Sequence, residues 1–459
     1  MLLINRNEMD MTTGPLTEKL VAYAVPVVIT GILQLLFNAA DVIVVGRFAG
    51  RTALAAVGST TSLINLMVNL FMMISIGVNV AAARHYGAHD PIEVSKTVST
   101  AMTMSVIIGI FVGIFGITAS RSMLVAMDSP PDVLDQAALY LKIYFIGIPA
   151  FMVYSFGAAV LRAVGDTQRP MRYLTIAGIV NVILNLITVV GFKMGVAGVA
   201  IATAVSQYVS AAFIVMSLIT TESCLHLEVK EMRIYKDRLV EILKIGLPAG
   251  LQSLLFSISN VMIQSSVNAF GSTIMAASAA SSNIEGFVYT SMNAVTQAAM
   301  AFTGQNMGAR KYENIAPILK KCVAIVIIVG GGMGLLCCLF SNGLINIYAN
   351  GDPEVIAWGV QRLRIVTATY AIMGISDVVV SVMRGMGNST LPMLISVFGI
   401  CAFRILWLHT ACVWYPTFPM IIIGYPVSWT VTLIGQTVCY NITKRRVIAG
   451  YEEIYAQIT

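Results

Sequence analysis

The sequence predicts an all-α integral membrane protein with twelve transmembrane helices arranged in two six-helix lobes. Three observations predict it. Of the 459 residues, 57% are hydrophobic and 11% are charged, whereas a soluble domain carries about 25% charged residues. Apolar runs of the length that spans a bilayer, about 20 residues, recur along the whole chain. The second half of the chain also repeats the pattern of the first half at a constant offset.

Each expected helix is an apolar run that begins and ends at Gly, Pro or charged residues. The breaks between runs read, in order, FAGR, HDP, DSPPD, GDTQRP, KMG, a long polar segment, FGS, GARK, NGDPE, GNST and YPTFP. The twelve expected spans lie at 18–44, 54–83, 95–118, 134–162, 171–191, 196–219, 239–267, 275–303, 316–343, 358–383, 391–412 and 419–442.

The distribution of basic residues predicts the orientation. Most of the 28 Lys and Arg residues fall in the terminal segments and in the loops after even-numbered helices. Because cytoplasmic loops are enriched in Lys and Arg, we expect both termini in the cytoplasm. We expect the plasma (inner) membrane as the location of this multi-pass protein. The net charge of +6 is thus a topology signal and indicates no nucleic-acid partner.

The repeat is clearest in one loop. Residues 161–171 read LRAVGDTQRPM and residues 383–393 read MRGMGNSTLPM. The offset between these two loops also pairs Pro26 with Pro248. Two halves with an even number of spans each have the same orientation, so the repeat is parallel. We expect an N-terminal lobe at 1–219, a cytoplasmic linker at 220–238 and a C-terminal lobe at 239–459.

The repeated loop has a local explanation. Gly165 and Gly387 are expected to end a helix in the left-handed conformation. Asp166 or Thr167 in the first half, and Asn388 or Ser389 in the second half, can cap the helix that follows. A rigid hairpin explains most of this motif, and a part in cytoplasmic gating is the alternative.

These loops, VPVVITGILQLLFNAADVIVVGRFAG at 25–50 and GVAGVAIATAVSQ at 195–207 together resemble the multidrug and toxic compound extrusion (MATE) family, bacterial type. The resemblance extends over nearly the whole chain. It implies two lobes around a central cleft and a secondary active antiporter that works by alternating access. Such an antiporter exports hydrophobic, cationic drugs or toxic metabolites in exchange for Na⁺ or H⁺. We expect a monomer in the lipid bilayer, small-molecule drug substrates and no cofactor.

Three acidic residues lie within apolar spans and away from the helix ends: Asp41, Glu285 and Asp377. A charged side chain at membrane depth costs at least about 2.5 kcal/mol, so each is a candidate functional residue.

Asp41 has polar neighbours at the same expected depth. Asn181 and Asn185 are four residues apart and share one helix face, and Thr203 follows on the next helix. At roughly 1.5 Å per residue, Asp41, Asn185 and Thr203 lie about 9–15 Å below the outer boundary. Their hard oxygen atoms suit Na⁺, with Asp41 and Asn185 as ligands, and a protonated Asp41 would serve H⁺.

The resemblance implies the same cation site, and the sequence does not decide between the two ions. Two plainer readings stay open. Asp41 could be a hydrated helix-end residue, and the two asparagines could only bind neighbouring helices together.

The second half has Ile263 where the first half has Asp41. We expect Glu285 and Asp377 to attract a cationic substrate or hold a second proton. Asn38 and its repeat partner Asn260 are further candidates for substrate contact. The alternative is an internal pair of these acids with Arg404, or with backbone groups, made only for folding.

Two other functions are weighed. A flippase for a lipid-linked precursor, from the same wider superfamily, would be expected to line its cleft with several cations, and Arg404 is the one candidate seen. A membrane-embedded enzyme would need paired catalytic groups, and Asp41 has no acid or base companion in its half. The sequence also lacks a phosphate-binding loop, so ATP use is not expected.

Overall fold

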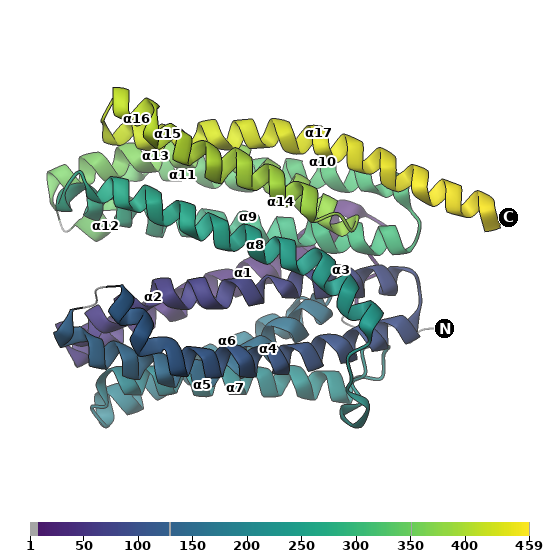
Figure 1. Cartoon of the computed structure of the whole chain (residues 1–459), viewed down its shortest axis with the longest axis horizontal. Coiled ribbons are helices and arrows are strands. Elements are labelled where there is room, and N and C mark those ends of the chain that lie inside the picture. Colours follow the sequence, from purple (N-terminus) through teal and green to yellow (C-terminus); the bar gives the residue numbers. More distant parts are fainter. Residues whose placement is uncertain (1–7, 128–129, 350, 459) are drawn as a thin grey trace. The chain divides into compact units, whose positions relative to one another are not determined.

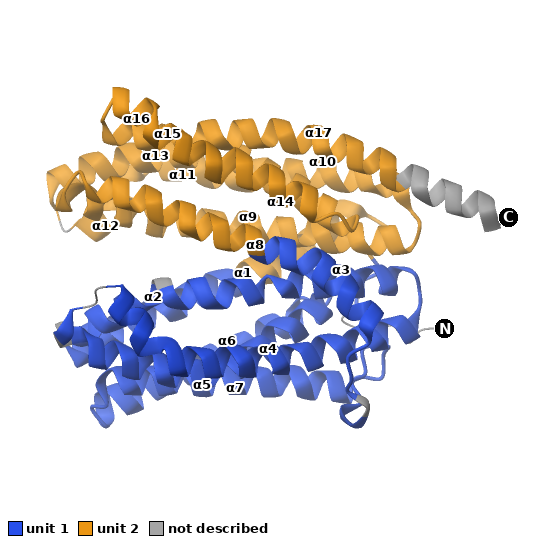
Figure 2. Cartoon of the chain, viewed as in Figure 1, with its two compact units in different colours: residues 1–10, 29–250 blue, residues 11–28, 251–459 orange. Residues whose placement is uncertain are grey.

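The computed structural model describes residues 8–127, 130–349 and 351–458, so parts of the expected turns at 128–132 and 350–354 lie outside the described residues. The described residues form helices and connecting turns, with no strand among them (Figure 1). They divide into two compact units (Figure 2). Unit 1 comprises Met1–Asp10 and Ile29–Gly250, and unit 2 comprises Met11–Val28 and Leu251–Thr459.

Unit 1 is a helix bundle built around α5 (Pro131–Ala163). Its other elements are the second part of α1 (Leu16–Val44), a π-helical turn (Val45–Ala49), α2 (Arg51–Met72), α3 (Ile74–Gly87), α4 (Pro91–Ala126), α6 (Gln168–Asn185), a π-helical turn (Leu186–Gly191), α7 (Gly195–Thr220), a 3₁₀ turn (Val229–Glu231) and the first part of α8 (Lys236–Asn268). Helix α5 contacts α2, α3, α4 and α7, which makes it the centre of the unit.

Unit 2 has the corresponding arrangement around α13 (Pro353–Gly385). Besides the parts of α1 and α8 that belong to it, it holds α9 (Ser272–Gly308), a 3₁₀ turn (Tyr312–Asn314), α10 (Ile315–Val326), a π-helical turn (Ile327–Gly331), α11 (Gly332–Leu339), α12 (Ser341–Ala349), α14 (Thr390–Ser396), a π-helical turn (Val397–Ala402), α15 (Phe403–His409), α16 (Ala411–Trp414) and α17 (Phe418–Ile458). Helix α13 contacts α9, α10, α11, α12 and α17. The repeat offset that pairs Pro26 with Pro248 also pairs both ends of α5 with both ends of α13. The same repeat element is therefore central in both units.

The predicted fold class is confirmed, but the count of twelve spans is not exact. Among the described residues, eleven helical segments are long and apolar enough to cross a membrane. The expected span at 275–303 forms α9, which is not one of the eleven. Helix α9 carries many Ser, Thr, Asn and Gln residues, and these lower its hydropathy.

The repeated loop folds as expected in both halves. Gly165 and Gly387 have φ values of +87° and +88°, the left-handed conformation that favours glycine. Asp166 Oδ1 accepts a hydrogen bond from the backbone N–H of Arg169 at 3.1 Å, and Asn388 Oδ1 accepts one from Leu391 at 3.4 Å. The predicted caps at Asp166 and Asn388 are therefore confirmed, whereas Thr167 and Ser389, which directly precede α6 and α14, make no side-chain cap hydrogen bond.

The two units exchange half-helices. One boundary between them follows Asp10, ahead of α1. The other two lie inside helices, after Val28 in α1 and after Gly250 in α8, two residues beyond Pro26 and Pro248 respectively. The lobe boundaries predicted from the sequence, at 219 and 239, follow the order of the repeats along the chain and stay a prediction. The boundaries of the two compact units are a different division, and two of them fall inside α1 and α8.

Each exchanged half-helix is anchored in its unit by specific contacts. In unit 2, Tyr23 of α1 packs edge-on against Phe302 with ring centroids 5.9 Å apart. In unit 1, Glu241 of α8 lies 2.9 Å from His85 Nε2 and 3.8 Å from Arg84 Nη1, both on α3. The first halves of α1 and α8 are thus integral parts of the units that hold them.

Helices α3 and α8 approach each other closely at two glycines. A Cβ atom on Gly77 would lie 2.1 Å from the carbonyl oxygen of Ile242, and one on Gly246 would lie 2.7 Å from that of Ile74. Small residues allow helices this close approach.

We expect Gly77→Ala to destabilise the protein by about 1–3 kcal/mol, because the added methyl group forces the two backbones apart. The matched control is Gly58→Ala in α2, where an added Cβ meets no atom within 4 Å. It should be neutral or stabilising by up to about 1 kcal/mol. Thermal melting of the purified protein in detergent measures both, and equal melting temperatures would contradict the close contact.

Candidate functional site

The four polar residues predicted as a cation site lie together inside unit 1. The Asn185 amide nitrogen donates to Asp41 Oδ1 at 2.5 Å and to Asn181 Oδ1 at 3.2 Å. The Thr203 hydroxyl donates to Asp41 Oδ2 at 3.5 Å and accepts from the Asn181 amide at 3.4 Å. We call Asp41, Asn181, Asn185 and Thr203 the acid cluster.

Three helices position the acid cluster. Asp41 lies near the end of α1, Asn181 and Asn185 occupy one face of α6, and Thr203 lies on α7. Asn185 is completely buried, and its side-chain oxygen has no hydrogen-bond partner in the described part of the chain. An unpaired buried acceptor costs free energy. A bound cation, or a proton carried by Asp41, would satisfy it.

Sequence reasoning missed two neighbours of the acid cluster on the central helix. Tyr140 and Tyr144 of α5 both interact electrostatically with Asp41. Their rings stack with centroids 6.0 Å apart. Their spacing of four residues places them on one helix face, which is the signal that could have identified them.

In unit 2, Glu285 has a partner of opposite charge. Arg362 Nε lies 3.0 Å from Glu285 Oε1, and Arg362 Nη2 lies 3.1 Å from Oε2. The Ser281 hydroxyl also donates to Oε1 at 2.7 Å. Glu285 and Arg362 are only 7% and 5% exposed, so the carboxylate is neutralised within its own unit.

The alternative of a pair with Arg404 is therefore wrong for Glu285. An internal pair exists, but its cation is Arg362 on α13, the residue that holds the bidentate geometry. Sequence reasoning considered Arg404 and missed Arg362, which lies inside the expected span at 358–383. A count of cations within the spans would have added Arg362 as a second candidate beside Arg404, without deciding between the two.

The remaining candidates have no such partner. Asp377 is half-buried on α13 and makes no hydrogen bond or ion pair within the described residues, although Arg384 lies close enough to interact electrostatically. Asn38 on α1 and Asn260 on α8 are exposed. Their roles in substrate contact stay predictions.

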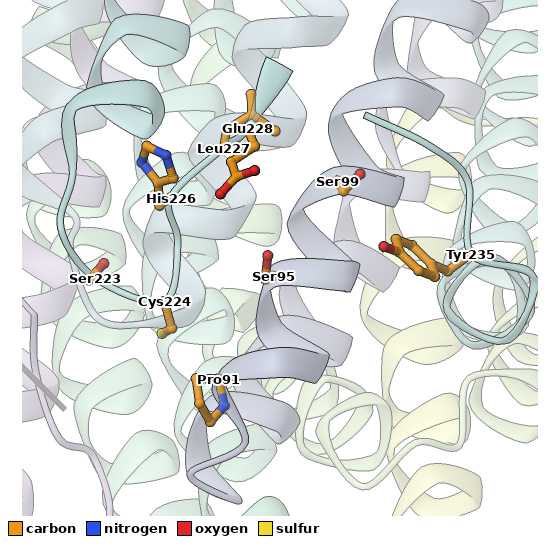
Figure 3. A pocket seen from close by; sticks show the side chains of 9 residues that line it. All are labelled: Pro91, Ser95, Ser99, Ser223, Cys224, His226, Leu227, Glu228 and Tyr235. Carbon is orange, nitrogen blue, oxygen red and sulfur yellow. The ribbon is translucent and has the colours of Figure 1, made fainter. Parts of the chain in front are cut away.

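A small cavity lies between α4 and the linker (Figure 3). Its volume of about 190 Å³ is below the roughly 300–1,000 Å³ of sites for drug-sized ligands. The lining residues are Pro91, Ser95, Ser99, Ser223, Cys224, His226, Leu227, Glu228 and Tyr235. Burial raises the pKa of the Cys224 thiol to about 12, which keeps it protonated. Two hydrogen bonds between Ser99 and the backbone of Arg233, of 3.0 and 3.1 Å, fix the linker to α4.

Comparison with known proteins decides the family. The sequence model of the MatE family matches residues 26–187 and 248–407, more than half of the chain, and the two matches begin at the repeat partners Pro26 and Pro248. The chain belongs to the MatE family. It is 25% identical to the probable multidrug resistance protein YoeA of Bacillus subtilis, over 90% of both chains.

Solved MATE structures share the fold. A crystal structure of MATE in the straight conformation superimposes with a TM-score of 0.88 at 20% identity, covering 95% of this chain and 98% of the other. One in the bent conformation gives a TM-score of 0.87 at 20% identity, covering 96% and 98%. MatE membership makes this chain a multi-pass membrane transporter, and it indicates no catalytic family. The flippase alternative is not favoured.

We expect Glu285→Gln to destabilise this MatE protein by about 3–5 kcal/mol, because it leaves the buried Arg362 guanidinium without its counter-charge. The double variant Glu285→Gln/Arg362→Met removes the stranded charge and should recover most of the loss. Melting temperatures of Glu285→Gln, Arg362→Met and the double variant measure how strongly the two residues depend on each other. Additive losses would show that the pair is not structural.

Proposed function

We propose that this MatE transporter is a secondary active antiporter of the plasma membrane. It exports hydrophobic, cationic drugs or toxic metabolites in exchange for Na⁺ or H⁺. Its similarity to the probable multidrug resistance protein YoeA supports the substrate class. One observation supports the coupling of export to a cation: Asp41 is held at the centre of the acid cluster by neutral groups alone.

The chemistry of the acid cluster suits a small cation. Asp41 supplies one negative charge, and Asn181, Asn185 and Thr203 supply oxygen atoms that prefer hard ions. Among the described residues, no three or more His, Cys, Asp or Glu side chains gather as they would around a tightly held metal ion. One carboxylate accounts for one Na⁺ or one H⁺ at a time.

Helix α1 offers a path from the cation to the rest of the protein. Its second half carries Asp41 in unit 1, while its first half belongs to unit 2. Pro26 lies within the helix, where it removes a backbone hydrogen bond and favours a bend. We infer that cation binding at Asp41 reseats α1 and drives alternating access.

We expect ethidium release from proteoliposomes to be driven by an imposed Na⁺ gradient or an imposed pH gradient. Asp41→Asn should reduce the driven rate at least about tenfold, since a charge-assisted contact contributes about 1.5–3 kcal/mol. The matched control is Asp135→Asn, an acid whose side chain is 79% exposed. It should transport like the parent.

The gradient that drives release identifies the coupled ion. If Asp41→Asn transports with unaltered ion coupling, the acid cluster is not the coupling site. If neither gradient moves ethidium in the parent, the antiporter proposal fails.

Asp377 supplies the proposed attraction for cationic substrates in unit 2. Its half-buried carboxylate has no hydrogen bond or ion pair within the described residues. We expect Asp377→Asn to weaken binding of ethidium by about tenfold and to change binding of a neutral dye by less than about twofold. Fluorescence titration of the purified protein measures both, and equal losses would contradict the role.

A further inference from the structure

Unit 2 contains a buried cation that no acid neutralises. Arg404 lies on α15, inside the candidate membrane span Thr390–Trp414, and is 6% exposed. Among the described residues, no Asp or Glu forms an ion pair with it. A charged side chain at membrane depth is costly and is expected to serve a function when it is kept.

The guanidinium is held in place by uncharged groups. Arg404 Nε donates to the Ser428 hydroxyl at 3.0 Å. The guanidinium carbon lies 4.2 Å from the centre of the Tyr425 ring and 5.9 Å from that of Trp429. Within the described residues the other two nitrogen atoms make no hydrogen bond. They form one side of the planar fork, which matches the two oxygens of a carboxylate or phosphate.

The acids of unit 2 do not supply the missing charge. Glu285 is committed to Arg362 through both carboxylate oxygens. Arg362 lies 5.8 Å from the Tyr425 ring, which places it beside the Arg404 group. Asp377 comes fifteen residues after Arg362 on α13, roughly 22 Å along the helix axis. The charge of Arg404 is therefore left for a ligand.

In the repeat, the surroundings of Arg404 in unit 2 correspond to the acid cluster of unit 1. At the offset that pairs Pro26 with Pro248, Tyr425 is the equivalent of Thr203, and Arg362 is the equivalent of Tyr140. The position of Asp41 is taken by Ile263, so the first unit has a carboxylate where the second has cations and aromatic rings. A π-helical turn, Val397–Ala402, directly precedes α15. Such turns are frequent at functional sites.

We propose that Arg404, Tyr425, Trp429 and Ser428 bind the oxyanion of an amphipathic, aromatic solute, which we call the oxyanion site. The guanidinium receives a carboxylate or phosphate group, and the rings of Tyr425 and Trp429 contact the aromatic part. This inference rests on the proposed function and deepens it. The transported compounds include zwitterions and anions as well as simple cations.

Rhodamine B and its ethyl ester test the oxyanion site, because they share one cationic ring system and differ in a free carboxylate. Fluorescence anisotropy measures both dyes on the purified full chain without an ion gradient. Arg404→Gln should weaken binding of the acid at least about tenfold and of the ester less than about twofold. The matched control is Arg364→Gln, an exposed arginine on α13 that should change neither.

Equal weakening of both dyes, or no change for either, would overturn the proposal. If Arg404→Gln does not fold, Arg404→Lys replaces it, and the acid should still bind more weakly than to the parent because lysine lacks the planar fork. The measurement needs no transport. Loss of ion-driven ethidium release therefore bears on the antiporter and leaves the oxyanion site untouched.

A phospholipid headgroup presents the same oxyanion, so the source of the ligand is separated by a second arm. Dye binding is repeated in nanodiscs with and without phosphatidylglycerol. If the anionic lipid displaces the acid from the parent but not from Arg404→Gln, the ligand is a headgroup. If it leaves the affinity unchanged, the ligand is a solute. Both outcomes keep the oxyanion site.

Discussion

A charged group inside an apolar helix bundle must find its partners within that bundle, because hydrocarbon offers none. The protein meets this constraint differently in its two units. Asp41 is surrounded by amides and a hydroxyl, which orient the carboxylate without cancelling its charge. Glu285 is cancelled by a bidentate arginine. The first arrangement leaves a net charge available for a cation, and the second does not. The neighbours of a buried acid, rather than the acid itself, therefore decide whether its charge is available to a cation or is cancelled within the fold.

One fold thus carries two different chemistries. The central helices α5 and α13 begin and end at equivalent positions, and the repeated loop has equivalent caps in both halves. Backbone geometry depends on these glycine and cap positions, which the repeat retains. The side chains that point into each bundle are not bound by the same requirement. At equivalent places one unit has Tyr140 and the other Arg362, so the units share their architecture and differ in charge.

The fold was predictable from the sequence because its determinants are local or periodic. Apolar runs, breaks at Gly and Pro, and the constant offset between the two halves define the helices and the repeat. The meeting of Asp41 with Asn185 and Thr203 was also within reach, since depth can be counted from helix ends. The partner of Glu285 was not. Choosing between Arg362 and Arg404 requires the rotation of each helix about its axis, which an almost uniformly apolar sequence leaves undefined.

The exchange of half-helices was equally hidden, because α1 and α8 each read as one uninterrupted span. It gives the chain two helical connections, each crossing from one unit to the other just after a proline, besides the crossing that follows Asp10. The two helical crossings lie at equivalent positions of the repeat but differ in charge. Beyond its crossing, α1 carries Asp41, whereas α8 carries Ile263 at the equivalent position. We infer that a coupling cation acts on one connection and not on the other. The proposed coupling is then asymmetric, although the two halves that transmit it share one fold.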